Sequence, residues 1–241
     1  MIANMRRLHI LCIHLFLVIM LLMNSVSLAN MESDWGFGVN PEWANKYVSE
    51  GRNNLDSGGL FSIDVSNSWN QLTLGGWFAN GDTESYQEVE IYLEYAFEFY
   101  TLESYIKYSR LEFPKNDEDD DNELAAGFEY AQSDLFIPSV DYTWSSEATG
   151  GFLELTLSSV IDYGLSEFTF TPYITQAFDF GYATSDYNGP NNIQVGIEAI
   201  MSLKRNSSLG INFNHSWSQG DVDRDDGGDV TWFGVALKLD I

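Results

Sequence analysis

Hydrophobic and polar side chains alternate strictly over long parts of this chain. Between Glu88 and Tyr100, apolar residues occupy every odd position from Val89 to Phe99, and the even positions include Glu90 and Glu98. A period of two puts the two sets on opposite faces of a strand, whereas a helix does not use this pattern. The stretch slightly exceeds the roughly 9–11 residues that a tilted strand needs to cross a membrane. The pattern predicts a membrane-spanning strand with glutamates on one face.

The same alternation recurs down the chain and predicts about twelve antiparallel strands. We expect them at roughly residues 35–48, 58–67, 70–80, 86–100, 102–113, 122–132, 135–146, 150–161, 167–178, 192–203, 207–217 and 230–241. In the first range Pro41 interrupts the pattern, so a start only near Glu42 is the alternative. An even number of strands lets the first pair with the last. The predicted fold is therefore all-β, a closed transmembrane antiparallel β-barrel.

The connections between the expected strands alternate in length. Residues 66–68, 100–101, 132–134 and 204–207 form short connections, whereas 114–122, 179–192 and 218–229 are longer and more polar. A barrel whose termini both face the periplasm has tight turns at that end and long loops at the other. Connection length thus supports the barrel independently of hydrophobicity.

The first 29 residues differ from the rest of the chain. Arg6 and Arg7 precede an apolar stretch from Leu8 to Met23, and small residues follow up to Ala29. This order is typical of a secretory signal peptide, and the apolar stretch is too short to span a bilayer. We therefore expect a signal peptide at 1–29 and the barrel at 30–241. The only cysteine, Cys12, would be lost on cleavage, which removes thiol chemistry from the mature protein.

The expected mature chain is strongly acidic. It contains nine basic and 36 acidic residues, a net charge of −27, which makes nucleic acid an unsuitable partner. It has no apolar run long enough for a membrane helix. A soluble periplasmic β-sandwich or lipocalin-like barrel is thus the alternative fold, and it would bury the opposite faces of the same strands.

Carboxylates dominate the face that a membrane barrel would turn toward its lumen. The candidate pore-lining residues are Glu88, Glu90, Glu94, Glu98, Lys107, Glu129 and Glu198. Asp64, Glu123 and Glu154 share this face, and Lys107 and Lys238 are available as counter-charges. Such a row of carboxylates is also expected in a barrel interior that is merely solvated or ion-paired and has no transport function. The functional interpretation is a lining that attracts cations.

Catalytic groups are scarce. The expected mature chain has one histidine, His215, which shares its strand face with Phe213 and Trp217, while the neighbouring serines point the other way. Barrel phospholipases as a family keep histidine and serine on one face, so His215 fits an aromatic belt better than a hydrolase site. No phosphate loop or zinc pattern is present. We expect no catalytic residues, cofactors or dedicated metal site.

Two loops are rich in acids, at residues 117–121 and 221–229. The second begins like a calcium loop, but Asp226 stands where glycine is needed and Trp232 where the bidentate glutamate is needed. We expect both loops to be solvated on the outer side, where divalent cations could bridge them to lipopolysaccharide. Near the strand ends, aromatic residues are candidates for interfacial girdles: Trp77, Tyr86, Trp144, Trp217 and Trp232.

Part of the chain resembles a known group of proteins. Residues 45–51, 59–63 and 72–78 resemble the opening of a family of uncharacterised, conserved hypothetical exported proteins of bacteria. That family has a Tyr-Val-x-Arg-Gly element, a strand pair with a Gly-x-Trp-like segment and a Glu-rich strand similar to 87–95. Here Glu50 stands at the arginine position. The resemblance covers roughly the first half of the mature chain; it implies an outer-membrane barrel and brings no established function.

These observations predict a protein of the Gram-negative outer membrane, surrounded by lipid and lipopolysaccharide. The leading functional hypothesis is a small porin-like channel whose acidic lumen passes small solutes, preferentially cations. A closed structural or surface-contact barrel without transport is the second hypothesis. An outer-membrane hydrolase is the third, disfavoured by the isolated His215.

Overall fold

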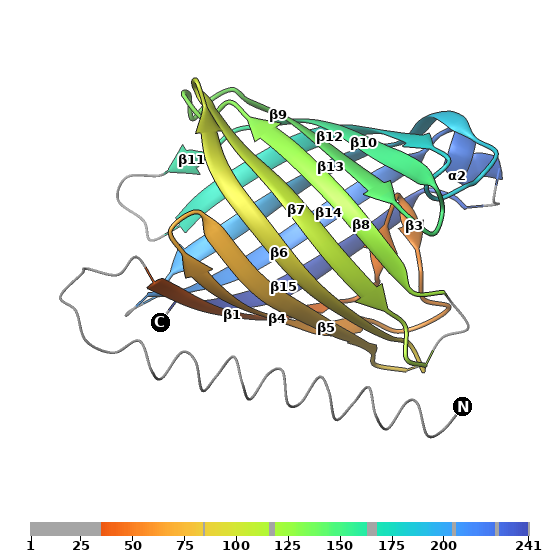
Figure 1. Cartoon of the computed structure of the whole chain (residues 1–241), viewed down its shortest axis with the longest axis horizontal. Helices are drawn as coiled ribbons and strands as arrows, with labels where there is room; N and C mark the ends of the chain where they lie inside the picture. Colours follow the sequence, from red (N-terminus) through yellow and green to blue (C-terminus); the bar gives the residue numbers. More distant parts are fainter. Residues whose placement is uncertain are drawn as a thin grey trace. The chain divides into compact units, whose positions relative to one another are not determined.

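The computed structural model describes residues 35–83, 85–115, 119–162, 168–203, 206–224 and 227–240. The expected signal peptide at 1–29 lies outside these residues. The described chain forms one antiparallel barrel of twelve long strands (Figure 1). The long strands form one closed ring, in which β10 pairs with β12 and the first strand, β1, pairs with the last, β15. Each of the twelve long strands thus has two neighbours, as a barrel in lipid requires.

The strands follow the order of the sequence around the barrel. Their bounds are β1 Trp35–Ala44, β4 Leu60–Trp69, β5 Leu72–Gly81, β6 Gln87–Phe99, β7 Leu102–Glu112, β8 Asp121–Glu129, β9 Ile137–Ser145, β10 Gly150–Ser158, β12 Phe168–Phe180, β13 Asn188–Ser202, β14 Ser207–Ser218 and β15 Val230–Asp240. Three short strands complete the set: β2 Val48–Ser49, β3 Arg52–Asn53 and β11 Ile161–Asp162. A five-residue helix, α2 Gly220–Arg224, lies between β14 and β15.

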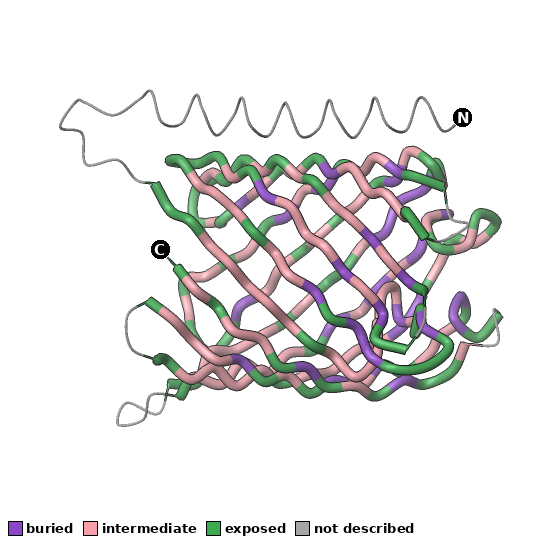
Figure 2. Tube along the Cα trace, turned by 90° about the horizontal axis from the view of Figure 1, so that it is seen from below, coloured by how far each residue is buried: buried purple, intermediate pink, exposed green. Residues whose placement is uncertain are grey.

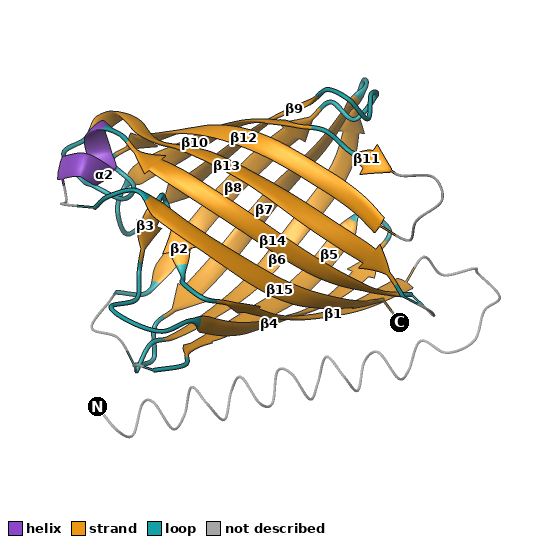
Figure 3. Ribbon diagram, turned by 180° about the vertical axis from the view of Figure 1, so that it is seen from behind, coloured by secondary structure: helices purple, strands orange, loops and turns teal. Residues whose placement is uncertain are grey.

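The predicted twelve-strand barrel is confirmed, but several boundaries differ. Residues 66–68 belong to β4, and the turn lies at Asn70 and Gln71, with a positive φ of 52° at Asn70. β1 ends at Ala44 rather than at residue 48. β13 begins at Asn188, four residues before the expected start, because the polar residues ahead of its alternating pattern also pair with β12. The length alternation is also imperfect, since residues 146–149 make a tight turn at the end that carries α2 (Figure 3).

The outer face of the barrel is apolar. Ile91 is 56 % exposed and Phe213 is 55 % exposed, although both are large hydrophobic residues, while Glu88 on the other face is 5 % exposed. This arrangement suits lipid around the barrel and excludes the soluble alternative, which needs the apolar face inside. Among the described residues, no helix is long and apolar enough to cross a membrane.

Aromatic residues ring the barrel, but not all of those expected. Trp144 and Trp217 lie on the outer face, and Trp35 at the start of β1 stacks on Trp69 with ring centroids 6.2 Å apart. Trp77 and Trp232, in contrast, line interior cavities, and Tyr86 is buried against Glu88. The girdle prediction is wrong for these three because each occupies an inward position of its strand or loop.

His215 lies on the outer face of β14, as its position in the alternation predicted. Its ring packs edge-on against Trp217 at 4.5 Å, and its Nδ1 lies 2.6 Å from the Thr231 hydroxyl. These contacts fit an interfacial belt. The nearby Ser216 points to the interior, where its hydroxyl accepts a hydrogen bond from Asn192.

Inside the wall, tyrosines lie across glycines of the neighbouring strand. Tyr105 on β7 pairs with Gly127 on β8, and its hydroxyl donates to Asp141 on β9 at 2.8 Å. Tyr173 similarly pairs with Gly196, and its hydroxyl shares a hydrogen bond of 2.7 Å with the Asn214 side-chain amide. A glycine leaves the space that the ring fills, so each row ties three strands together.

We expect Gly127→Val to destabilise the barrel by about 1–3 kcal/mol, through overpacking. A Cβ at position 127 would lie 2.2 Å from the Tyr105 ring and 2.4 Å from the Asp141 carboxylate, so the ring must leave its place. The urea midpoint of the detergent-folded protein, followed by its gel mobility shift, measures this. Gly228→Ala is the control, because its Cβ would meet no atom within 4 Å. Equal midpoints for the two variants would contradict the role given to these rows.

Candidate functional site: an acidic lumen crossed by a hairpin

Carboxylates outnumber cations on the inner wall. Among the described residues of the twelve long strands, the inward positions carry only two bases, Lys107 and Lys238. The inward carboxylates include Glu42, Asp64, Glu88, Glu90, Glu94, Glu98, Glu103, Glu123, Glu129, Asp141, Glu154 and Glu198. The interior therefore has a strongly negative potential.

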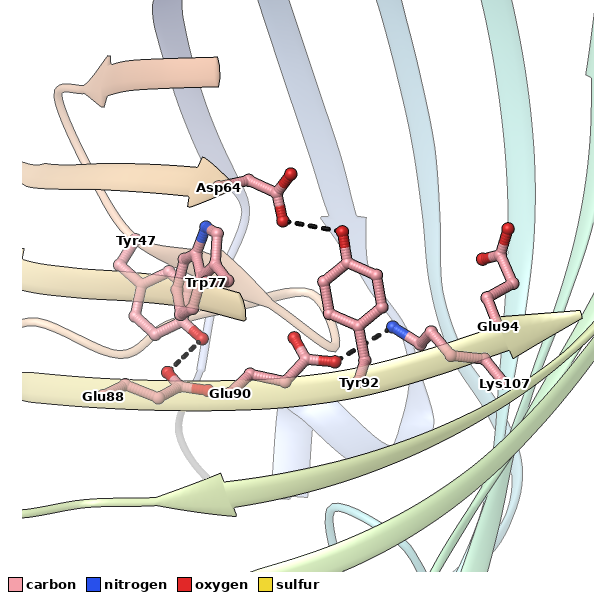
Figure 4. A pocket seen from close by; sticks show the side chains of 8 residues that line it. All are labelled: Tyr47, Asp64, Trp77, Glu88, Glu90, Tyr92, Glu94 and Lys107. Atoms are coloured by element: carbon pink, nitrogen blue, oxygen red, sulfur yellow. Dashed lines mark hydrogen bonds and ion pairs between the residues drawn. The ribbon is translucent and has the colours of Figure 1, made fainter. Parts of the chain in front are cut away.

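A first cavity of about 430 Å³ lies against strands β4 to β7 (Figure 4). On its wall the Lys107 ammonium is 3.1 Å from a Glu90 oxygen, which also accepts from the Ser109 hydroxyl at 2.6 Å. The Tyr92 hydroxyl donates to Asp64 at 2.9 Å. Glu94 borders the same cavity and faces Lys107 in the strand register. The cavity lining thus has one lysine and four carboxylates, Glu88 included, and keeps a negative excess.

The predicted pore-lining residues fall into three places. Glu88, Glu90, Glu94 and Lys107 all border the first cavity. Glu98 lies near the end of the barrel where β1 begins and β15 ends, and it pairs with Glu103, which in turn pairs with Glu129. Glu198 is on β13 in another part of the wall. The strand period therefore groups four of the seven, and the pore-lining role of all seven stays a prediction.

The lumen contains an element that the sequence did not predict. After β1 the chain forms a small hairpin, β2 and β3, which pairs only with itself. Its turn residues Glu50 and Gly51 have φ values of 46° and 74°, the left-handed pair of a type I′ turn. Gly51 also approaches Asn192 of β13 so closely that a Cβ would lie 2.7 Å from its Cγ. The hairpin therefore reaches the wall formed by β13.

Tyr47 joins the base of the hairpin to the wall formed by β5 and β6. Its hydroxyl donates to Glu88 at 2.8 Å, and its ring lies 6.3 Å from Trp77. Burial and the Glu88 charge raise the pKa of Tyr47 well above its ordinary value, so the phenol stays a donor. Leu55, 3 % exposed, packs into the same cluster. Glu88 thus accepts from the hairpin base and is buried rather than free to meet a solute.

Arg52 joins the hairpin to the opposite wall. Its guanidinium donates to Asp221 of α2 at 2.9 Å and to Asn191 of β13 at 3.1 Å. It also donates to the Thr184 hydroxyl at 3.3 Å. Asp221 is fully buried, so the expectation that its loop is merely solvated is wrong for this residue. The acid is buried because an arginine 169 positions earlier in the chain neutralises it.

Several other described acids of the two loops also have protein partners. Asp120 is 2.6 Å from the Arg110 guanidinium, and Asp121 accepts the Asn122 and Glu147 amides. Asp229 accepts the Ser218 amide at 3.0 Å. Among the described parts of these loops, no group of three or more acids, histidines or cysteines is placed to hold a metal ion. Residues 117–118 and 225–226 lie outside the described chain.

A second cavity, of about 370 Å³, lies beside the hairpin turn. Glu50 enters it together with Glu123 and Glu154 of the wall, while Tyr182 and Trp232 supply aromatic surface. Burial raises the pKa of Glu50 to about 7, and the charges of Glu123 and Glu154 add to this, while Ser49 and Arg52 oppose it. The Glu50 carboxyl is therefore protonated in a substantial fraction of the molecules at neutral pH.

Most buried residues gather toward the end of the barrel that carries α2 (Figure 2). This is also the end where the hairpin and its partners lie (Figures 1 and 3). The described core is thus not a hydrophobic centre but the contact between the hairpin and the wall. Glu50-Gly51, flanked by the short strands, is the one feature of the sequence that could have indicated a hairpin.

No protein-family model and no curated protein matches the chain. Solved structures do. The KdgM porin in complex with disordered oligogalacturonate is 10% identical, with a TM-score of 0.56, covering 85% of this chain and 98% of that chain. The NanC porin is 8% identical, with a TM-score of 0.56, covering 84% and 98%.

LpxR from Salmonella typhimurium is 9% identical, with a TM-score of 0.55, covering 84% of this chain and 99% of that chain. The chain has the fold of outer-membrane barrels. At these identities the likeness establishes the architecture, and the functions of these proteins do not pass to this chain with it. The resemblance to uncharacterised exported proteins stays a prediction.

We expect the fluorescence of Trp232, which shares the second cavity with Glu50, to titrate with a midpoint near pH 7. The pKa of Glu50 is raised in the fold, so the folded protein holds a proton that the unfolded chain releases near its ordinary value of 4.5. Stability contributed by this proton is present at low pH and is lost as pH rises toward 7. Glu50→Gln should remove the midpoint, and Trp232→Phe should remove the signal.

Glu147→Gln, at an exposed turn, is the matched control and should titrate like the unmodified protein. A midpoint near pH 7 that persists in Glu50→Gln would assign the transition to another group and contradict the prediction.

Proposed function

We propose that this protein is a porin-like channel of the outer membrane that favours small cations. The observation that carries the proposal is the first cavity, whose lining sets Asp64, Glu90 and Glu94 against a single lysine inside a closed barrel. Fixed negative charge in a low-dielectric lumen concentrates cations and repels anions.

Two of the structurally similar proteins are porins, which supports a channel. One of them was solved with oligogalacturonate, a polyanion. A polyanion would be repelled by the inner wall of this chain, where the described strands offer Lys107 and Lys238 against a dozen carboxylates. The preferred solute therefore differs in charge from the one named for KdgM.

A closed barrel without transport is the second candidate, and one observation favours it. The hairpin is tied to opposite walls through Tyr47 and Arg52, so it narrows the lumen at the end that carries α2. A hydrolase is not proposed, because His215 lies on the outer face against Trp217 and away from the inward carboxylates.

Planar-bilayer recordings of the refolded mature protein test the channel. We expect cation-selective steps, and Glu94→Gln should lower the ratio of cation to anion permeability by at least about twofold at low salt. Glu112→Gln is the matched control, because this residue lies on the outward face of β7 and should leave the ratio unchanged. A correctly folded protein that never conducts would remove the channel and favour the closed barrel.

A further inference from the structure

The hairpin is attached to the barrel by side chains and by its two ends. β2 and β3 form a separate two-stranded sheet and share no ladder with any barrel strand. The hairpin can therefore move without breaking the hydrogen bonds that close the barrel. This separates it from the twelve strands, each of which is fixed by two neighbours.

The two ends of the segment are firmly placed. At its start, Asn45 exchanges two hydrogen bonds with Phe233 of β15, one from each backbone amide, at 3.0 and 2.8 Å. At its end, Leu55 is buried, and Gly58 follows with a φ of 82°. Motion is thus restricted to the part between them, which contains the turn at Glu50 and Gly51.

Arg52 makes the contacts that hold this moving part against the far wall. One guanidinium bonds to α2, to β13 and to the loop after β12 through Asp221, Asn191 and Thr184. The Asn191 amide also donates to the backbone oxygen of Glu50 at 2.7 Å. Three of these four bonds are made by the Arg52 guanidinium, so those three form or break together.

We propose that the hairpin is a gate held shut by Arg52 and Asp221, and that its movement sets how wide the lumen opens. The proposal rests on the channel function proposed above. With the Arg52 contacts made, the hairpin spans the lumen from the Tyr47 side to the β13 side. When these contacts are broken, the turn withdraws from β13, and the two cavities on either side of the hairpin become connected.

A disulfide between the hairpin turn and the wall tests the movement. A Cβ built at Gly51 lies 3.0 Å from the Cβ of Asn192, close to the roughly 3.5–4.5 Å that a disulfide spans. The expected mature chain has no other cysteine, so Gly51→Cys with Asn192→Cys gives one defined crosslink. We expect a mean bilayer current at least about tenfold lower in the oxidised double variant than after reduction. Each single variant, treated with the same reductant, controls for the substitutions.

Asp221→Asn supplies a second measurement that does not depend on crosslinking. The change keeps the shape of the side chain and removes the charge that Arg52 faces, so the shut state should lose on the order of 100-fold in relative population. We expect longer and larger open steps than in the unmodified protein. Asp223→Asn, on the same helix but bonded to Ser218, is the matched control and should record like the unmodified protein.

The outcomes separate the two proposals. Equal currents before and after reduction, together with unchanged steps in Asp221→Asn, would overturn the gate and leave a channel with a fixed constriction. Folded protein without conductance in the unmodified, reduced and Asp221→Asn forms would overturn the channel and the gate together.

Discussion

The hydrocarbon of a membrane offers no hydrogen bonds to a backbone, and this constraint governs the whole molecule. A sheet meets it only by closing on itself, here through β1 with β15 and β10 with β12. Closure then dictates that every second side chain turns toward lipid and every other one toward the interior. The apolar belt and the acidic lumen are two results of the same alternation. A shift of one residue in any strand would turn its apolar side chains inward and its carboxylates toward lipid.

An interior with so many carboxylates needs ways to tolerate them. The chain uses tyrosine hydroxyls as donors, at Asp64, Asp141 and Glu88, more often than it uses cations. Neutral donors stabilise each carboxylate without cancelling its charge. The wall therefore stays negative while its side chains are held in place. Lys107 and Arg52 are exceptions, because each forms an ion pair between two elements. Lys107 of β7 pairs with Glu90 of the neighbouring strand β6, and Arg52 of the hairpin pairs with Asp221 of α2.

The periodic part of the structure could be predicted from sequence, and the non-periodic part could not. Strands such as β6 and β15 repeat a pattern that only one geometry satisfies, so their faces and approximate bounds follow from the residues. The hairpin has two strands of two residues each, too short to show any period. Trp77 and Trp232 resemble girdle residues by their position near strand ends, but the alternation itself puts them on the inner face, opposite Phe78 and Phe233. The burial of Asp221 depends on Arg52, and pattern does not reveal a partner so far along the chain.

That distance along the chain also bears on how the protein folds. Asn45 bonds to Phe233 across 188 positions, and Arg52 to Asp221 across 169, so both contacts need the C-terminal strands to be present. Contacts of such long range close large loops and form late. The hairpin therefore settles into the lumen only when β14 and β15 have joined the sheet. Its docking therefore follows the closure of the sheet, and its contacts with β15 and α2 are among the last to form.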